Sequence, residues 1–255
     1  MKNRPIAVFD SGLGGISVLR ELLRQMPHEN FLYFGDSANA PYGTRSTEEI
    51  RSLTEQNAKM LFDRGAKALV IACNTATSAA VQELRKKYPE KIIIGIEPAL
   101  KPAADAFPNG TLLVMATDAT LREEKFEALM LKFQGDCTIF KCPCPGLVEF
   151  VERGELEGSD LHNRLLEILA PYPMDKVDAI VLGCTHYPFL KKAIGEAVGE
   201  KPLLLDGSDG TAKETRRRLA EAGLLQTEGE GSVKLENSLP SPEILELGQM
   251  LLQLP

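Results

Sequence analysis

Two short apolar runs of matching design dominate the hydrophobic pattern of this chain. Residues 67–78 read Lys-Ala-Leu-Val-Ile-Ala-Cys-Asn-Thr-Ala-Thr-Ser, and residues 177–187 read Val-Asp-Ala-Ile-Val-Leu-Gly-Cys-Thr-His-Tyr. Each β-branched run predicts a buried parallel strand, and each Cys stands where that strand turns into the next helix. We therefore expect Cys73 and Cys184 at the carboxyl edge of a sheet, where α/β proteins bind ligands.

The rest of the chain alternates between strand-like and helix-like segments. Apolar runs of strand length recur at 6–9, 31–35, 92–96, 111–116, 138–141 and 203–205, with amphipathic segments between them and helices expected over 211–222 and 242–252. Because the pattern restarts after Pro98, we expect an α/β fold of two pseudo-symmetric doubly wound parallel-sheet lobes, with the active site in the cleft between them. Residues 1–97 and 210–255 are assigned to the first lobe, and 98–209 to a second, inserted lobe.

Composition narrows the function classes. The 255 residues, 44% of them hydrophobic, suffice for one large or two small domains. A net charge of −7 without a basic run argues against nucleic acid as a partner. The amino-terminal apolar run is too short for a signal segment, and no run is long enough to span a membrane, so a cytoplasmic protein is expected. An odd number of cysteines, five, then predicts free thiols.

The two cysteines carry the candidate chemistry. A free thiol has a pKa of about 8.5, which the amides and dipole at a helix N-terminus lower. Cys73 and Cys184 are thus expected to be reactive. The alternative is that each is a small buried residue closing a strand. Their matching contexts, each followed by a hydrogen-bonding residue and one by His186, favour a functional pair.

Polar turns follow other predicted strands. Asp10 and Ser11 end the first strand and suit a cationic group or proton steering, whereas the neighbouring glycines fit no nucleotide-binding motif. In the loop 36–43, Pro41 fixes the backbone and Gly43 permits close approach to a ligand, although an ordinary turn is the alternative. Hydroxyls of Thr117 and Thr120 can bind a carboxylate, or Thr120 can simply cap a helix.

Three further cysteines, Cys137, Cys142 and Cys144, do not have the usual spacing of a metal site, and no second ligand pair follows them. We therefore expect no metal. Glu152, taken alone, is interpreted as a solvated helix charge. His28 and His162 are interpreted as surface residues.

Paired thiols suit one kind of reaction in particular. If the lobes are related by a pseudo-twofold axis, Cys73 and Cys184 face each other across the cleft. Inverting a stereocentre needs a base on one face of the substrate and an acid on the other. Side chains that could hold the protonation states are Asp10, His186 and Glu152. Side chains that could bind the carboxylate and ammonium groups of a substrate are Ser11, Asn74, Thr75 and Thr185.

Four motifs together resemble the glutamate racemases of the aspartate/glutamate racemase superfamily. They are Phe-Asp-Ser-Gly-Leu-Gly-Gly at 9–15, Pro-Tyr-Gly at 41–43, Ala-Cys-Asn-Thr-Ala at 72–76 and Gly-Cys-Thr-His-Tyr-Pro at 183–188. The resemblance covers essentially the whole chain in the expected order. It implies cofactor-independent interconversion of L- and D-glutamate, which supplies D-glutamate for peptidoglycan, and commonly a homodimer.

The resemblance also assigns residues. It implies that Cys73 and Cys184 are the catalytic cysteines, and that Glu152 assists the second of them although its segment, Val-Glu-Phe-Val-Glu-Arg-Gly at 148–154, departs from the usual family pattern. The positions it implies for substrate contact are Asp10, Ser11, Pro41, Tyr42, Gly43, Asn74, Thr75, Thr117, Thr120, Thr185 and His186.

Three alternatives stay open from the sequence. One is a relative that acts on aspartate or another small acid. A second is a cysteine amidohydrolase that uses Cys184 with His186 and an acid, for which Cys73 would be dispensable. The third is a two-lobed amino-acid-binding protein, which the paired thiols disfavour. The apolar segment 244–252 could form a dimer interface or complete the first lobe.

Overall fold

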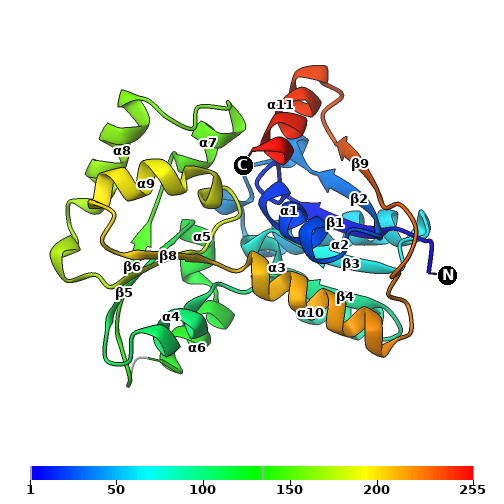
Figure 1. Cartoon of the computed structure of the whole chain (residues 1–255), viewed down its shortest axis with the longest axis horizontal. Coiled ribbons are helices and arrows are strands. Elements are labelled where there is room, and N and C mark those ends of the chain that lie inside the picture. Colours follow the sequence, from blue (N-terminus) through cyan, green and yellow to red (C-terminus); the bar gives the residue numbers. More distant parts are fainter. Residues whose placement is uncertain (1, 134, 255) are drawn as a thin grey trace.

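The strands of the protein form two separate parallel sheets, seen side by side in Figure 1. The structure is a computed structural model that describes residues 2–133 and 135–254, and only the backbone of Lys125. The first sheet contains β1 (Ile6–Asp10), β2 (Asn30–Gly35), β3 (Ala68–Ile71), β4 (Ile92–Gly95) and β9 (Ser232–Asn237). The second contains β5 (Thr111–Ala116), β6 (Thr138–Pro143), β7 (Ala179–Leu182) and β8 (Leu203–Asp206). We call each sheet with its helices a lobe.

The two sheets share one topology. The first has the order β4-β3-β1-β2-β9 and the second the order β6-β5-β7-β8, and every pairing is parallel. Apart from the edge strand β9, each sheet therefore runs second, first, third, fourth in its own chain order. The two cysteine-bearing runs, β3 and β7, are the third strands of their lobes. The predicted fold class, two α/β lobes with repeated architecture, is confirmed.

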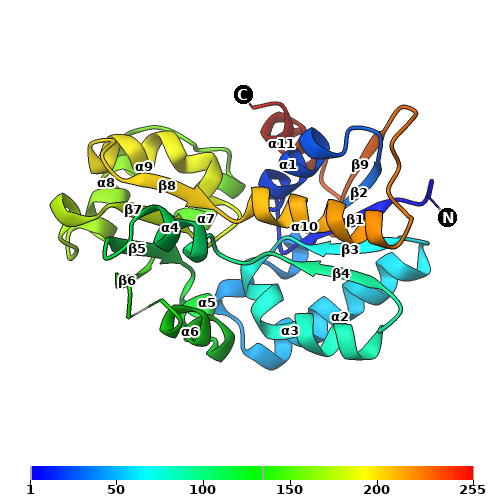
Figure 2. The same ribbon diagram turned by 60° about the horizontal axis from the view of Figure 1, so that its bottom comes forward.

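Helices cover both faces of each sheet (Figures 1 and 2). In the first lobe, α1 (Ile16–Gln25), α10 (Ser208–Glu221) and α11 (Pro242–Gln253) pack on one face, and α2 (Thr47–Asp63) and α3 (Asn74–Lys87) on the other. In the second lobe, α7 (Leu147–Glu152), α8 (Ser159–Leu169) and α9 (Lys191–Val198) lie opposite α4 (Leu100–Ala106), α5 (Asp118–Arg122) and α6 (Glu124–Leu131). Short 3₁₀ helices are η1 (Ser37–Asn39), η2 (Tyr42–Thr44), η3 (Met174–Lys176) and η4 (Tyr187–Leu190).

The closing segment returns to the first lobe. Helix α10 packs against α1 and β4, and α11 packs against α1 and β9. The sequence did not predict β9, because Ser232–Asn237 is a half-exposed edge strand without an apolar run. The lobe boundaries near residues 97 and 209 stay a prediction.

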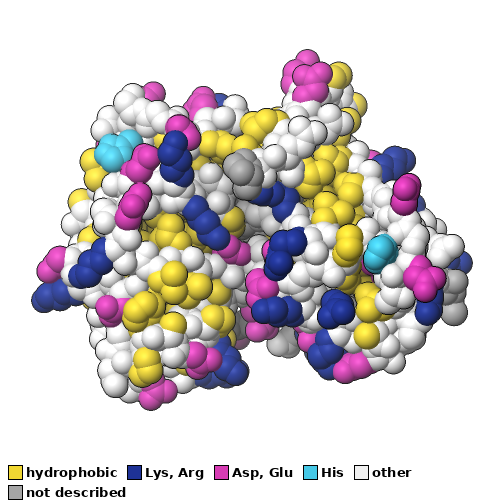
Figure 3. Space-filling model, in the orientation of Figure 1, with side chains coloured by type: hydrophobic (Ala, Val, Ile, Leu, Met, Phe, Trp, Pro, Cys, Tyr) yellow, Lys and Arg dark blue, Asp and Glu magenta, His cyan; other side chains and the backbone are white. Residues whose placement is uncertain are grey.

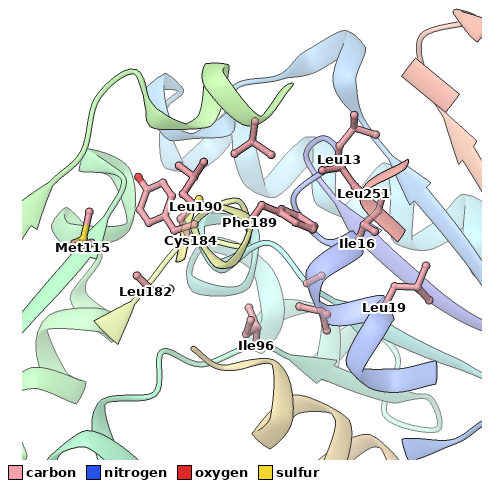
Figure 4. Close-up of a cluster of buried hydrophobic side chains, with 14 of the residues drawn as sticks. Leu13, Ile16, Leu19, Ile96, Met115, Leu182, Cys184, Phe189, Leu190 and Leu251 are labelled. Atoms are coloured by element: carbon pink, nitrogen blue, oxygen red, sulfur yellow. The ribbon is translucent and has the colours of Figure 1, made fainter. Parts of the chain in front are cut away.

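Apolar packing joins the lobes into one body. A single core cluster contains residues of both sheets, including Ile16 and Leu251 from the first lobe and Leu182 from the second. Phe189 extends from η4 toward Leu13 and Ile16 (Figure 4). Because close-packed interiors resist deformation, this junction fixes how one sheet edge faces the other.

Charged side chains on the face shown in Figure 3 are mixed in sign. The basic residues of α10 gather there with acidic neighbours, as in the ion pairs of Lys213 with Asp209 and Arg217 with Glu214. Within residues 2–133 and 135–254, every helix is too short or too polar to cross a membrane.

A buried ion pair ties together segments far apart in the sequence. Lys67, just before β3, donates from Nζ to Glu29 Oε2 at 2.5 Å and to the carbonyls of Lys2 and Leu224. Glu29 Oε1 accepts from the amide of Gln226 at 2.9 Å. The side chains of Lys67 and Glu29 are 2% and 0% exposed. A buried charge is stable only while its partner is present.

We therefore predict that Glu29→Gln destabilises the protein by about 3–5 kcal/mol, because it leaves the Lys67 ammonium buried without an opposite charge. Urea denaturation of purified protein measures this change. The matched control is Asp63→Asn, which removes the exposed ion pair of Asp63 with Lys59 and should leave the free energy of unfolding nearly unchanged. Equal effects of the two substitutions would contradict the prediction.

Candidate active site

Cys73 lies at the N-terminus of a long helix. Strand β3 ends at Ile71, and Cys73 is the N-cap of α3, with its Sγ accepting from the amide of Ala76 at 3.4 Å. The thiol also lies 3.5 Å from Ser11 Oγ, which places the end of β1 beside it. Cys73 is buried, with 5% of its surface exposed.

The thiol of Cys73 is not a ready thiolate in this structure. Burial raises the pKa of Cys73 to about 12, and the charge of Asp10 acts in the same direction, while the Ala76 amide opposes it. The expectation that a helix N-terminus would leave this thiol acidic is therefore wrong, because desolvation and a nearby carboxylate outweigh the amides. Asp10 is also perturbed, since burial raises its carboxyl pKa although His186 and the Gly12 amide lower it.

Cys184 has different surroundings. It follows β7 but precedes the short 3₁₀ helix η4 rather than an α-helix. Its Sγ lies 3.6 Å from His186 Nδ1, and His186 Nε2 lies 2.7 Å from Glu152 Oε1. The same Glu152 oxygen accepts from the backbone amide of Leu13, across the lobes, at 2.7 Å. The interpretation of Glu152 as a solvated charge is wrong, because α7 turns its side chain inward onto His186.

The His186–Glu152 pair is electrostatically matched. Burial alone lowers the pKa of His186, but hydrogen bonds and charges from Cys184 and Glu152 outweigh it and hold the pKa well above 6.5. Burial raises the pKa of Glu152, yet its interactions with His186 bring it below the ordinary value. The raised pKa of His186 and the lowered pKa of Glu152 both favour an imidazolium beside a carboxylate.

Hydroxyl groups connect the two lobes reciprocally at this edge. Thr185, after the third strand of the second lobe, donates from Oγ1 to Oδ2 of Asp10, which ends the first strand of the first lobe, at 3.0 Å. The matching contact runs from the first lobe to the second. Thr75, after the third strand of the first lobe, has its Oγ1 3.2 Å from Thr117 Oγ1 and 3.0 Å from Thr120 Oγ1, and both of these residues follow the first strand of the second lobe. Each third-strand turn thus contacts the first-strand turn of the other lobe.

Most of the predicted site residues line one pocket between the lobes. Those on its wall are Ser11, Pro41, Tyr42, Gly43, Cys73, Asn74, Thr75, Thr117, Glu152, Cys184, Thr185 and His186. Asp10 and Thr120 are not on the wall. They lie behind it, hydrogen-bonded to Thr185 and to Thr75 respectively.

The loop with Pro41 to Gly43 is held from behind. Asp36 accepts hydrogen bonds from Tyr42 Oη at 2.7 Å, Asn39 Nδ2 at 3.0 Å and Asn57 Nδ2 at 3.1 Å. A Cβ on Gly43 would lie 3.0 Å from Thr117 Cβ, so glycine permits the loop to approach the second lobe. The ordinary-turn alternative does not describe this buried network.

Several wall residues were missed from the sequence, namely Ala40, Thr44, Asp118, Cys144, Pro145, Gly146, Val148 and Glu149. Three of them belong to the turn between β6 and α7, which has no recognisable motif, and two belong to α7 itself. The sequence feature that could have identified Cys144 is its position directly after strand β6, because the carboxyl end of β6 lies at the same edge of the sheet as Cys184. The two neighbouring cysteines lie close together, with Cys144 Sγ 3.8 Å from Cys142 Sγ. No third metal-ligating side chain joins them, since no cluster of three such side chains occurs among the described residues.

Comparison with known proteins agrees with this geometry. The family model for Asp/Glu/Hydantoin racemase matches residues 10–215, which contain both cysteines and all of the reciprocal contacts. The chain belongs to this racemase family.

Relatives in the family match along the whole chain. Glutamate racemase of Clostridium perfringens strain ATCC 13124 is 52% identical over 255 residues, which is 100% of this chain and 98% of that protein. Glutamate racemase of Clostridium acetobutylicum is 49% identical, over 100% of this chain and 99% of that protein.

Solved structures of the family have the same fold. A glutamate racemase isoform from Bacillus anthracis matches with a TM-score of 0.90 and 29% identity, covering 100% of this chain and 96% of that one. Glutamate racemase from Francisella tularensis in complex with D-glutamate matches with a TM-score of 0.86 and 30% identity, covering 100% and 95%.

In the pocket of this protein, one polar atom lacks a hydrogen-bond partner. Asn74 is 4% exposed, and its Oδ1 is buried without a hydrogen bond among the residues that the structure describes. Buried polar atoms are nearly always paired, which makes Asn74 an exception among the described residues of the pocket wall.

We predict that Glu152→Gln lowers the pKa of His186, because it removes the carboxylate that offsets burial. Proton–nitrogen NMR of the imidazole rings over pH measures this, and His28 and His162 serve as internal controls. The same pair makes stability depend on pH. In the wild type, Glu152 and His186 both contribute fully to the free energy of unfolding between pH 4.5 and pH 6.5, the ordinary pKa values of the two side chains. The His186 contribution is lost as pH rises through its raised pKa, and the Glu152 contribution as pH falls through its lowered pKa. A His186 that titrates near 6.5 in the wild type would contradict this account.

Proposed function

We propose that the chain interconverts L-glutamate and D-glutamate without a cofactor, by acid/base catalysis with two thiols. The observation that carries the proposal is the placement of Cys73 and Cys184. They follow the third strands of two sheets with the same topology and line one pocket from its two lobes. The high identity to glutamate racemases over the full chain supports glutamate as the substrate.

In the proposed reaction, one cysteine thiolate removes the α-proton and the thiol on the opposite face returns a proton to the planar intermediate. In the direction where Cys73 is the base, it must first lose its own proton, and its raised pKa opposes this. A substrate ammonium close to Cys73 and Asp10 would lower that pKa, because an opposite charge stabilises the thiolate. Binding and activation are thereby coupled on this side.

Cys184 has a different auxiliary group beside it. The His186 imidazolium lies next to Cys184 and can stabilise its thiolate or return a proton to it. Glu152 holds His186 in place and in its charged form. The two cysteines thus perform matched steps with different auxiliary groups, Asp10 for Cys73 and the His186–Glu152 pair for Cys184.

Substrate binding is assigned to uncharged donors and acceptors. Asn74, which lines the pocket, is proposed to contact the ammonium group. Amides at the N-terminus of α3 and the hydroxyls of Ser11, Thr75 and Thr185 suit the α-carboxylate. The hydroxyl of Thr117, held from behind by Thr120, suits the side-chain carboxylate of glutamate together with Tyr42 and Gly43.

The biological setting follows from the product. We propose that D-glutamate made by this enzyme enters peptidoglycan synthesis, that the enzyme acts in the cytoplasm, and that it forms a homodimer. The premise of this setting, that D-glutamate is a product, is supported by the Francisella tularensis relative, whose structure is a complex with D-glutamate.

One observation favours a second candidate function, hydrolysis of an amide substrate. Cys184, His186 and Glu152 form a continuous chain of contacts, at 3.6 and 2.7 Å, of the kind that activates a nucleophilic cysteine. Cys73 would have no role in such a hydrolase, so its substitution separates the two functions.

We predict that Cys73→Ser and Cys184→Ser each lower racemisation by at least about 10²-fold in both directions, because each removes one of two required acid/base groups. Chiral chromatography of glutamate incubated with each variant measures this, starting from either enantiomer. The control is Cys137→Ser, a buried cysteine whose thiol bonds the carbonyl of Phe107 outside the pocket. Full racemisation by the Cys73 variant would contradict the two-thiol mechanism, and release of ammonia from glutamine by that variant would favour the hydrolase.

A further inference from the structure

Ser17 is a buried hydroxyl residue that contacts the opposite lobe. It lies in the first turn of α1, is 8% exposed, and is not on the pocket wall. Its Oγ lies 2.8 Å from the carbonyl oxygen of Thr185 and 2.8 Å from that of Gly14. A helix in the first lobe therefore reaches the peptide bond between Thr185 and His186 in the second lobe, in the turn that carries Cys184.

The two carbonyl oxygens depend on Ser17 to different extents. The Gly14 carbonyl also accepts the backbone amide of Ser17 at 3.0 Å. Among the hydrogen bonds of residues 2–133 and 135–254, the Thr185 carbonyl accepts from Ser17 Oγ alone. Loss of the hydroxyl would leave a buried carbonyl without a donor, and the Thr185 peptide would have to rotate to find another.

Thr185 is held at two points by the first lobe. Its side chain donates to Asp10, and its carbonyl accepts from Ser17. The side chains of Thr185 and His186 lie close against the backbone of Gly14, since a Cβ on Gly14 would lie 2.6 Å from Thr185 Oγ1 and 2.3 Å from His186 Nδ1. A rotation of the peptide bond between Thr185 and His186 would therefore move His186, whose Nδ1 lies 3.6 Å from Cys184 Sγ.

We propose that Ser17 is a positioning residue for Cys184, which sets the place of that thiol, and not of Cys73, relative to the substrate. The inference rests on the proposed racemase function. Ser17 contacts the turn that carries Cys184, whereas Cys73 is placed by β3 and by the N-terminus of α3. The effect of losing the hydroxyl is thus confined to one of the two acid/base groups.

A fault in one thiol has a kinetic signature that general destabilisation lacks. Because the equilibrium constant of a racemisation is unity, kcat/KM must fall equally for both enantiomers. The isotope effects need not change equally. Proton removal becomes more rate-limiting for the enantiomer that Cys184 deprotonates, and less so for the enantiomer that Cys73 deprotonates.

The test compares Ser17→Ala, Ser17→Thr and Ser17→Val with the wild type. Thr and Val have the same shape, so this pair isolates the hydroxyl even if the Ala variant does not fold. The control is Thr54→Val, which removes a buried hydroxyl bonded to the Ile50 carbonyl within α2. Kinetics are measured with protiated and α-deuterated glutamate of each configuration.

We expect the Ala and Val variants to lose about 10-fold to 10²-fold in kcat/KM, as is typical of a misplaced reacting group, and the Thr variant to remain close to wild type. The primary isotope effect should rise for one enantiomer and fall for the other. Equal activity in the Thr and Val variants, or an isotope effect that changes equally for both enantiomers, would overturn the proposal.

A second readout does not depend on racemase activity. Alkylation by iodoacetamide, followed by mass spectrometry of the tryptic peptides, reports the reactivity of each thiol separately. The Val variant should alkylate several-fold faster at Cys184 and at the wild-type rate at Cys73. If the wild type fails to racemise glutamate but the alkylation shift is present, the proposed function is wrong and the positioning role stands. If the wild type racemises glutamate and no shift occurs, the positioning role is wrong.

Discussion

The geometry of the site depends on a reciprocal set of hydroxyl hydrogen bonds between the lobes. Thr185 bonds Asp10, and Thr75 bonds Thr117 and Thr120, so each third-strand turn is held by the first-strand turn of the other sheet. The apolar junction around Phe189 holds the lobes together but is not directional. The hydrogen bonds supply direction and register. Together they place two cysteines from separate sheets on the wall of one pocket.

Symmetry of the backbone does not extend to the proton chemistry. Cys73 has a helix N-terminus and a buried carboxylate beside it, and its pKa is raised to about 12. Cys184 lacks the long helix but has an imidazolium held by Glu152. A racemase must treat two mirror-image substrates with one rigid set of chiral side chains. Different auxiliary groups on the two sides are a reasonable physical consequence, since the ammonium and carboxylates cannot occupy mirror-related positions in both complexes.

Local patterns predicted the parts of this protein that depend on local physics. Uninterrupted runs such as Ile6 to Phe9 and Ala68 to Ile71 predicted buried parallel strands, because both faces of those strands are covered by helices. The turns after the strands predicted most of the pocket wall, because parallel strands end at a common edge. Strand β9 was missed, because an exposed edge strand needs no apolar run.

The errors at the site have a common cause. The sequence alone makes Glu152 look solvated, because its partner His186 is distant in sequence and only the packing of α7 brings them together. The pKa of Cys73 was expected to be low, because the helix is visible in the sequence whereas the degree of burial is not. Ser17 carries no motif of its own, and its contact with Thr185 exists only once the lobes have docked.

The central claim is that two thiols act on opposite faces of one substrate carbon, and isotope incorporation tests it most directly. L-Glutamate is incubated with the wild-type enzyme in deuterium oxide, and both enantiomers are analysed early in the reaction. The account predicts that the D-glutamate formed carries deuterium at the α-carbon while the remaining L-glutamate keeps its proton, because the thiol that returns the proton has exchanged with solvent. Retention of the proton in the product, or exchange in the remaining substrate as fast as product forms, would show that a single base acts and would contradict the account.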